Sequence, residues 1–171
     1  DTLETQVNVL ANFDPKIPKN YTNLDILVLG NLDPKVQLSV ISQFEKRPKF
    51  TMLDTMNFWM DNTLDNLLKI ISKVDLICIN DEEVIQLSGC KDYKNGIKKI
   101  LTMGPKYLIM KKGEYGSTLY SDNLEFFCPS FKVKKVIDPT GAGDSFAGAF
   151  AGHLAESKNY TFESISNALI Y

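Results

Sequence analysis

The chain has 171 residues, of which 44% are hydrophobic, and this is enough for one domain with a substantial hydrophobic core. Its 19 basic and 21 acidic side chains give a net charge of −2, and they are scattered along the chain rather than gathered into a stripe. This composition argues against nucleic acid as the main partner and against binding to a membrane surface. It does not exclude anionic ligands, because backbone amides can bind an anion without net positive charge.

The cysteines indicate a compartment, and the first residues indicate a longer chain. Cys78, Cys90 and Cys128 are too few and too irregularly spaced for a disulfide framework or a zinc site, so we expect reduced thiols in a cytoplasmic protein. No apolar run approaches the roughly 20 residues that a membrane-spanning helix needs. Residues 1–4 contain neither an initiating Met nor a signal sequence, and we expect residues 1–171 to be one domain from a longer chain.

Short apolar runs alternate with helical patterns along the first two thirds of the chain. Strands are predicted at residues 25–29, 49–53, 75–79 and 107–110. Helices are predicted between them, at residues 34–44, 64–72, 81–87 and 93–102. Nearly continuous apolar strands that alternate with helices predict a parallel sheet covered by helices on both faces.

The last third of the chain has a different pattern. Residues 117–120 and 124–127 are predicted to form a small antiparallel hairpin. The remaining predicted elements are a strand at residues 133–137, a long helix that ends near residue 156, and a last helix at residues 162–171. The whole pattern predicts an α/β fold, a three-layer α/β/α sandwich with a mainly parallel sheet and a small antiparallel hairpin.

The strongest chemical signal is the sequence Asp-Pro-Thr-Gly-Ala-Gly-Asp at residues 138–144, between a predicted strand and a predicted helix. Gly141 and Gly143 leave the backbone N–H groups open to a ligand. Together with the positive end of the helix dipole, these groups form an anion site. Asp144 then places a carboxylate beside the position of a bound phosphate. The simpler alternative is that Asp144 only caps its helix.

The helix after this turn carries two stripes with a four-residue spacing. The large stripe is Phe146, Phe150 and Leu154, and the small stripe is Ala147, Ala151 and Ala155. We expect the small stripe, with Gly148 and Gly152 beside it, to let the helix pack very close to the sheet. Each interior Gly costs the helix about 1 kcal/mol relative to Ala. Since a plain cap requires no such arrangement, the pattern favours the functional interpretation of Asp144.

Residues 138–146 resemble the signature of the PfkB carbohydrate kinase family, also called ribokinase-like, and the similarity extends over most of the chain. The resemblance implies that Asp144 is the catalytic base. It also implies an anion hole formed by the three preceding backbone amides, those of Gly141, Ala142 and Gly143. The implied reaction is the transfer of the γ-phosphate of ATP to a hydroxyl group of a small molecule. Catalysis of this kind depends on a base, on donors that neutralise the phosphoryl group, and on positioning.

The resemblance also implies ions. In potassium-dependent members of the family, the residues at the positions of Asp138 and Thr140 help to bind a monovalent cation, which implies K⁺ beside ATP and Mg²⁺. Asn80 and Glu83 follow another predicted strand, three residues apart on one helical face, where ligands of open α/β sheets bind. Alone they indicate an ordinary helix start. The resemblance implies that they organise Mg²⁺ and the phosphates, Glu83 through a water molecule.

Lys111, Gly113 and Gly116 follow the predicted strand at residues 107–110 and resemble the family's nucleotide loop. There, two glycines three residues apart let the backbone approach ATP. Lys111 stands where ribokinases frequently have Thr, and Lys111 or Lys112 could reach a phosphate. In the alternative interpretation, both lysines are simply solvated at the end of a strand.

Residues 54–59, Asp-Thr-Met-Asn-Phe-Trp, end another predicted strand at the same edge of the sheet. The family has an Asp-x-Asn-like element there, commonly followed by Arg, but the spacing here differs and Arg is absent. The role of Asp54 therefore stays open. We assign Trp59 to core or lid packing, and His153 to packing or to the surface rather than to catalysis.

Complete members of the family are longer, and their first half carries a small β lid that grips the substrate. The first hypothesis is therefore an ATP-dependent sugar kinase, and the second is a nucleoside kinase with the same fold. The third is a nucleotide-binding relative without catalysis, against which the combined presence of the predicted site residues argues. A homodimer formed through the lid is a further expectation.

Overall fold

The computed structural model describes residues 8–171, so the interpretation of residues 1–4 lies outside the described part. Its centre is a six-stranded sheet with the order β1-β2-β3-β4-β5-β6. The strands are β1 (Ile26–Leu29), β2 (Phe50–Asp54), β3 (Leu76–Asn80), β4 (Tyr107–Lys111), β5 (Ser117–Tyr120) and β6 (Glu125–Cys128). The first four strands pair in parallel, and β5 and β6 continue the sheet as an antiparallel hairpin. The predicted mainly parallel sheet with a small hairpin is confirmed.

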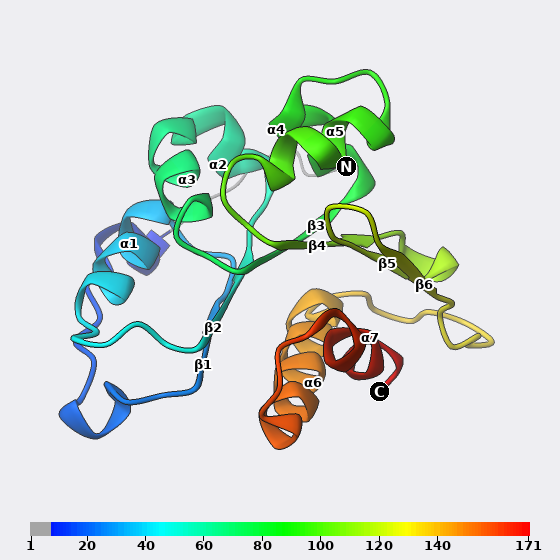
Figure 1. The fold of residues 1–171 in the computed structure, drawn as a ribbon. Helices are drawn as coiled ribbons and strands as arrows, with labels where there is room; N and C mark the ends of the chain where they lie inside the picture. The colour runs from blue at the N-terminus through cyan, green and yellow to red at the C-terminus, as the bar shows by residue number, and fades with distance from the viewer. Residues whose placement is uncertain (1–7) are drawn as a thin grey trace.

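Helices cover both faces of this sheet (Figure 1). On one face lie α1 (Pro34–Ser42), α2 (Asn57–Asn62), α3 (Leu64–Ile71), α4 (Asp81–Ser88) and α5 (Tyr93–Leu101). On the other lie α6 (Ala142–Ser157) and α7 (Phe162–Ile170). Short 3₁₀ helices are η1 (Asn8–Asn12), η2 (Lys19–Tyr21) and η3 (Gly113–Tyr115). The three-layer fold is therefore confirmed, and no helix among residues 8–171 is long and apolar enough to cross a membrane.

Two hydrophobic cores lie between the layers, because alternate residues of a strand point to opposite faces of the sheet. In β3, Cys78 belongs to the core under α6 and α7, and Ile77 to the core under the other five helices. Both residues are at most 1% exposed. The same alternation in β2 and β4 places their last residues, Asp54 and Lys111, on the side of α6 and α7.

The strand predicted at residues 133–137 does not form, and this prediction is wrong. Residues 131–140 are all exposed, with 60% of Val133 and 91% of Ile137 accessible to solvent. The adjacent edge of the sheet is β6, and no strand among residues 8–171 pairs with its outer side. Strand preference depends on packing and pairing with neighbours, so these apolar residues alone do not produce a strand.

The packing predicted for α6 is also wrong, because the large stripe faces the sheet. Phe150 is 2% exposed, whereas of the small stripe only Ala147 is buried and Ala155 is exposed. Nothing lies within 4 Å of a Cβ atom placed on Gly148 or Gly152. Burying the larger side chains removes more apolar area from water, and this determines which side of the helix turns inward.

Candidate active site

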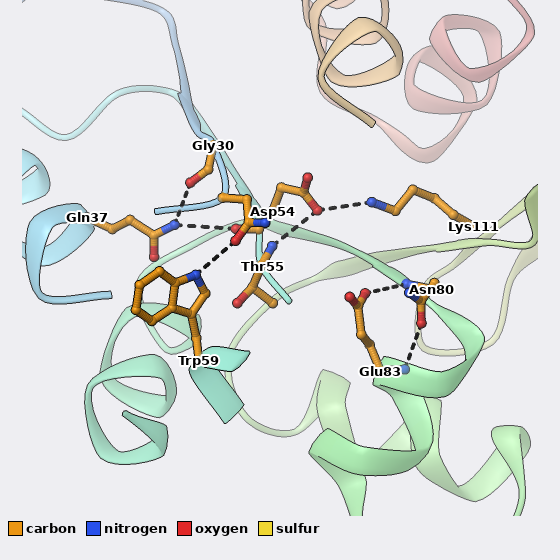
Figure 2. A network of polar contacts seen from close by, with 9 residues as sticks. Gly30, Gln37, Asp54, Thr55, Trp59, Asn80, Glu83 and Lys111 are labelled. Carbon is orange, nitrogen blue, oxygen red and sulfur yellow. Dashed lines mark hydrogen bonds and ion pairs between the residues drawn. The ribbon is translucent and has the colours of Figure 1, made fainter. Parts of the chain in front are cut away.

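The carboxyl ends of three adjacent strands carry the polar groups of the candidate site (Figure 2). Asp54 ends β2, Asn80 ends β3 and Lys111 ends β4, and Asn80 is the register partner of Lys111. The Nζ atom of Lys111 lies 3.1 Å from Oδ1 of Asp54. Ligands of open α/β sheets bind outside this edge of the strands.

The ion pair between Asp54 and Lys111 is largely shielded from water. The two side chains are 10% and 25% exposed, and Oδ1 of Asp54 also accepts the backbone N–H of Thr55 at 3.1 Å. Burial alone would lower the pKa of Lys111, but the acidic groups around it, Cys78, Asp54 and Glu83, outweigh burial and raise the pKa. Lys111 is therefore a cation at neutral pH.

The glycine-rich turn meets this ion pair from the other layer. Gly141, with φ +76°, precedes the first turn of α6. A Cβ atom placed on Gly143 would lie 3.9 Å from both Oδ2 of Asp54 and Nζ of Lys111. The positive end of the α6 dipole and the ammonium of Lys111 therefore lie side by side, and both favour a bound anion.

Asp144 lies in the first turn of α6 and is exposed. The N–H of Ala142 donates to the carbonyl of Pro139 at 3.1 Å, so this predicted anion-hole amide is engaged within the turn. The first N–H groups of any helix have no acceptor within the helix. Among the three predicted anion-hole residues, Gly143 lies beside the ion pair of Asp54 and Lys111.

A cleft of about 400 Å³ opens between this turn, the end of β4 and α7. Five predicted site residues line it, namely Lys111, Gly113, Gly116, Ala142 and Gly143. Its apolar wall includes Phe146 and Leu169. The volume lies in the range of small-molecule sites. The structure thus brings the predicted nucleotide loop and the predicted anion turn to one cleft.

The two glycines of the nucleotide loop differ in their surroundings. A Cβ atom on Gly116, where φ is +95°, would overlap the carbonyl oxygen of Cys128 and lie 2.8 Å from the backbone nitrogen of Ser130. Nothing lies within 4 Å of a Cβ atom on Gly113. Gly116 therefore permits the close approach of the segment after β6, whereas Gly113 borders open space.

Asn80 and Glu83 bind each other in a capping box. Oδ1 of Asn80 accepts the backbone N–H of Glu83 at 2.8 Å, and Oε2 of Glu83 accepts the backbone N–H of Asn80 at 2.7 Å. Glu83 is 5% exposed, and burial raises its pKa. The helix-start interpretation is thus present in the structure, and the role of Glu83 toward Mg²⁺ stays a prediction.

The donor atoms at this edge suit Mg²⁺, which prefers carboxylate oxygen, phosphate oxygen and water. Glu83 supplies a carboxylate, whereas the carboxylate of Asp54 is already paired with Lys111. Among residues 8–171 no group of three or more His, Cys, Asp or Glu residues could hold a metal ion. Mg²⁺ at this site would therefore depend on water and on the phosphates of a nucleotide, as it does in many ATP-dependent enzymes.

Asp138 and Thr140 lie together in the exposed segment before α6. Oδ1 of Asp138 accepts the backbone N–H of Thr140 at 2.8 Å, and hydrogen bonds from the side chain and the backbone of Thr140 hold the pKa of Asp138 below its ordinary value. Neither residue is among those that line the cleft. Their assignment to a monovalent cation stays a prediction.

Asp54 is the residue whose place in the site the sequence left open. Its signal was its position at the end of a predicted strand, on the edge that also carries Asn80. Trp59 is 5% exposed, and its Nε1 donates to Oδ1 of Asn31 at 2.9 Å, in agreement with a packing role. His153 stacks on Tyr171 with ring centroids 4.6 Å apart, also as expected for packing.

Known proteins are similar to this chain in fold and sequence. Residues 10–165 match the model of the pfkB family carbohydrate kinases. The chain is 28% identical over 136 residues to a cytidine kinase of Thermococcus kodakarensis, which covers 78% of this chain and 49% of that protein. The solved ribokinase of Thermotoga maritima superposes with a TM-score of 0.66 at 30% identity, over 85% of this chain and 46% of that one.

A double mutant of the fructokinase of Vibrio cholerae, solved with fructose, ADP and potassium ion, has the same fold. Its TM-score is 0.73 at 19% identity, over 94% of this chain and 54% of that one. The chain therefore spans about half the length of these relatives. Since the family model matches most of the sequence, the chain belongs to the pfkB family of carbohydrate kinases.

Proposed function

We propose that the whole protein transfers the γ-phosphate of ATP to a hydroxyl group of a small sugar. One observation carries this proposal: Gly143, in the first turn of α6, lies against the ion pair of Lys111 and Asp54. The backbone of Gly143, the helix dipole and a lysine ammonium thus lie together, with the carboxylate of Asp144 in the same turn. This is the arrangement that phosphoryl transfer needs, since its catalysis consists mainly of positioning and charge stabilisation.

In the proposed reaction, Asp144 accepts the proton of the acceptor hydroxyl while the oxygen attacks the γ-phosphorus. The bond between the γ-phosphorus and the bridging oxygen breaks, and ADP leaves. The amides of residues 141–143 and the ammonium of Lys111 stabilise the charge on the transferring group. The amide of Ala142 would first have to leave the carbonyl of Pro139.

Mg²⁺ bound to the phosphates would supply further charge neutralisation at this edge. Oε2 of Glu83 accepts the backbone N–H of Asn80, so Oε1 would be the oxygen that accepts a hydrogen bond from a metal-bound water. We propose that K⁺ binds near Asp138 and Thr140, and the fructokinase structure with potassium ion supports this proposal. The nucleotide would lie in the cleft beside Gly113, where open space borders the backbone.

A nucleoside is the second candidate acceptor. The similarity to a cytidine kinase over 136 residues favours it, whereas the ribokinase and fructokinase relatives favour a sugar. The two candidates share every step at Asp144 and differ only in the acceptor.

The experiment is an assay of ADP release by the complete protein with ATP·Mg²⁺ and a panel of sugars and nucleosides. We expect Asp144→Asn to keep ATP binding and to lose at least about a hundredfold in turnover, the scale of general-base catalysis. Asp122→Asn, which changes an exposed carboxylate between β5 and β6, is the matched control and should leave turnover unchanged. Activity of Asp144→Asn within a few-fold of wild type would reject the role of Asp144. ATP binding without transfer to any acceptor would support the non-catalytic alternative instead.

A further inference from the structure

Two consecutive lysines at the end of β4 diverge to opposite faces of the sheet. Lys111 lies on the α6 side, where its ammonium meets Asp54. Lys112 lies on the other side, with its Nζ 6.0 Å from the ring centroid of Tyr93 at the start of α5. Successive side chains of a strand point to opposite faces of the sheet, so the two lysines have different partners. Lys111 is therefore held in place, and its neighbour provides a natural comparison.

Asp54 is itself a fixed acceptor. Its Oδ1 accepts the backbone N–H of Thr55 at 3.1 Å, and its backbone carbonyl accepts Nε2 of the buried Gln37 at 3.3 Å. The first bond holds the carboxylate, and the second holds the backbone at the end of β2. The lysine side chain, in contrast, has a flexible four-carbon stem and needs an anchor to stay in one position.

The anchored ammonium lies where an anion would bind. A Cβ atom on Gly143 would lie 3.9 Å from both Oδ2 of Asp54 and Nζ of Lys111, which is ordinary van der Waals contact, so the first turn of α6 packs directly against the ion pair. An ion pair that served stability alone would have no reason to lie against the first turn of α6. A largely buried ion pair is also weak evidence for stability, because the cost of removing two charges from water offsets their attraction.

We propose that Asp54 is a positioning residue that holds the ammonium of Lys111 at the first turn of α6, where Lys111 contacts the γ-phosphoryl group of ATP. This inference rests on the proposed function. Lys111 stays protonated throughout and donates hydrogen bonds, so no bond to Lys111 or Asp54 forms or breaks. Asp54 acts through Lys111 and not on the substrate.

The test is a double-mutant cycle with Asp54→Asn, Lys111→Met and the double variant in the complete protein. The first readout is the ratio of the affinities for ATP·Mg²⁺ and ADP·Mg²⁺, measured by calorimetry, which needs no acceptor. We expect Lys111→Met to lower this ratio about tenfold, the scale of one charge-assisted hydrogen bond. Asp54→Asn should lower it by a similar factor, and the double variant should be no worse than Lys111→Met alone, because the second change removes nothing further.

The second readout is kcat for the best acceptor of the panel. Misplacing a catalytic contact by about 1 Å can cost roughly a hundredfold, so kcat of Asp54→Asn should fall by roughly ten- to a hundredfold with little change in the KM for the acceptor. Lys112→Met, which removes the same charge one residue away on the opposite face, should leave both readouts at wild-type values. If Asp54→Asn does not fold, D54E, which keeps the charge but moves it by one methylene, enters the cycle in its place.

The outcomes separate two failures. A double variant whose loss equals the product of the single losses would overturn this inference, because Asp54 would then act independently of Lys111. A loss in Asp54→Asn that persists in the Lys111→Met background and is relieved by added Mg²⁺ would also overturn it, in favour of direct metal binding by Asp54. If the wild-type protein binds ATP but transfers no phosphate, the ratio of the affinities for ATP·Mg²⁺ and ADP·Mg²⁺ still tests this inference. One that binds no ATP would reject the proposed function and this inference with it.

Discussion

Gly116 is the residue of the nucleotide loop whose replacement the structure predicts to be most damaging. In Gly116→Ala, the new Cβ would overlap the carbonyl oxygen of Cys128 and lie 2.9 Å from Cα of Pro129. These are backbone atoms, which cannot rotate away as a flexible side chain can. The segment after β6, which forms part of the wall of the cleft, would therefore have to move away from Gly116.

The expected cost has two parts. Gly116 has φ +95° and ψ −149°, close to a region that glycine alone adopts readily, and such strain costs about 1–3 kcal/mol. Overpacking against fixed atoms adds about 1–3 kcal/mol. The sum of roughly 2–6 kcal/mol is a large part of the total stability of about 5–15 kcal/mol of an ordinary protein. Gly113→Ala, at φ +54° with open space around it, should cost only the backbone strain of about 1–2 kcal/mol.

Urea unfolding of the two variants, followed by circular dichroism, measures the difference in the free energy of unfolding. Calorimetric titration with ATP measures the effect on the cleft, which we expect to be larger for Gly116→Ala. Equal losses of stability in the two variants would show that the close approach of Cys128 to Gly116 does not hold the loop, and would refute the reasoning.

Buried side chains support four further predictions. Glu83→Gln should raise the Mg²⁺ concentration needed for half-maximal activity without abolishing turnover, and superimposable Mg²⁺ titrations would return Glu83 to a purely structural role. Because burial raises the pKa of Glu83 in the folded protein, its contribution to stability is present below its ordinary pKa of 4.5 and is lost as the pH rises through the raised value. The stability of Glu83→Gln relative to wild type, measured as the difference between their urea midpoints, should therefore rise as the pH increases from about 4.5 to 7. A difference in midpoint that does not change with pH would contradict this. Burial raises the pKa of Cys78 to about 12, so a thiol reagent at neutral pH should leave Cys78 unmodified until the protein is unfolded. Leu154 is fully buried, so Leu154→Ala should lower the free energy of unfolding by about 2–5 kcal/mol. Ala155→Gly should lower it by only about 1 kcal/mol, the difference in helix propensity between Ala and Gly.

The kind and order of most elements are local properties of this sequence. The apolar runs at residues 25–29, 49–53 and 75–79 predict β1, β2 and β3 to within one residue. Continuous apolar runs separated by amphipathic helical patterns have few alternatives to a covered parallel sheet. The glycine-rich turn and the start of α6 are equally local, because small residues before a helical pattern determine where a helix begins and leaves its N–H groups free.

Other features depended on partners that lie far away in the chain. Asp54 and Lys111 are 57 residues apart, and they meet only because β2 and β4 flank β3 with the same parity, Asp54 opposite Cys78 and Lys111 opposite Asn80. The side of α6 that turns inward depended on which stripe buries more apolar area against the sheet. Whether residues 133–137 form a strand depended on a pairing neighbour. Local preferences act on the backbone of each segment, whereas ion pairs, helix orientation and strand pairing are properties of two surfaces in contact, and only the folded chain brings those surfaces together.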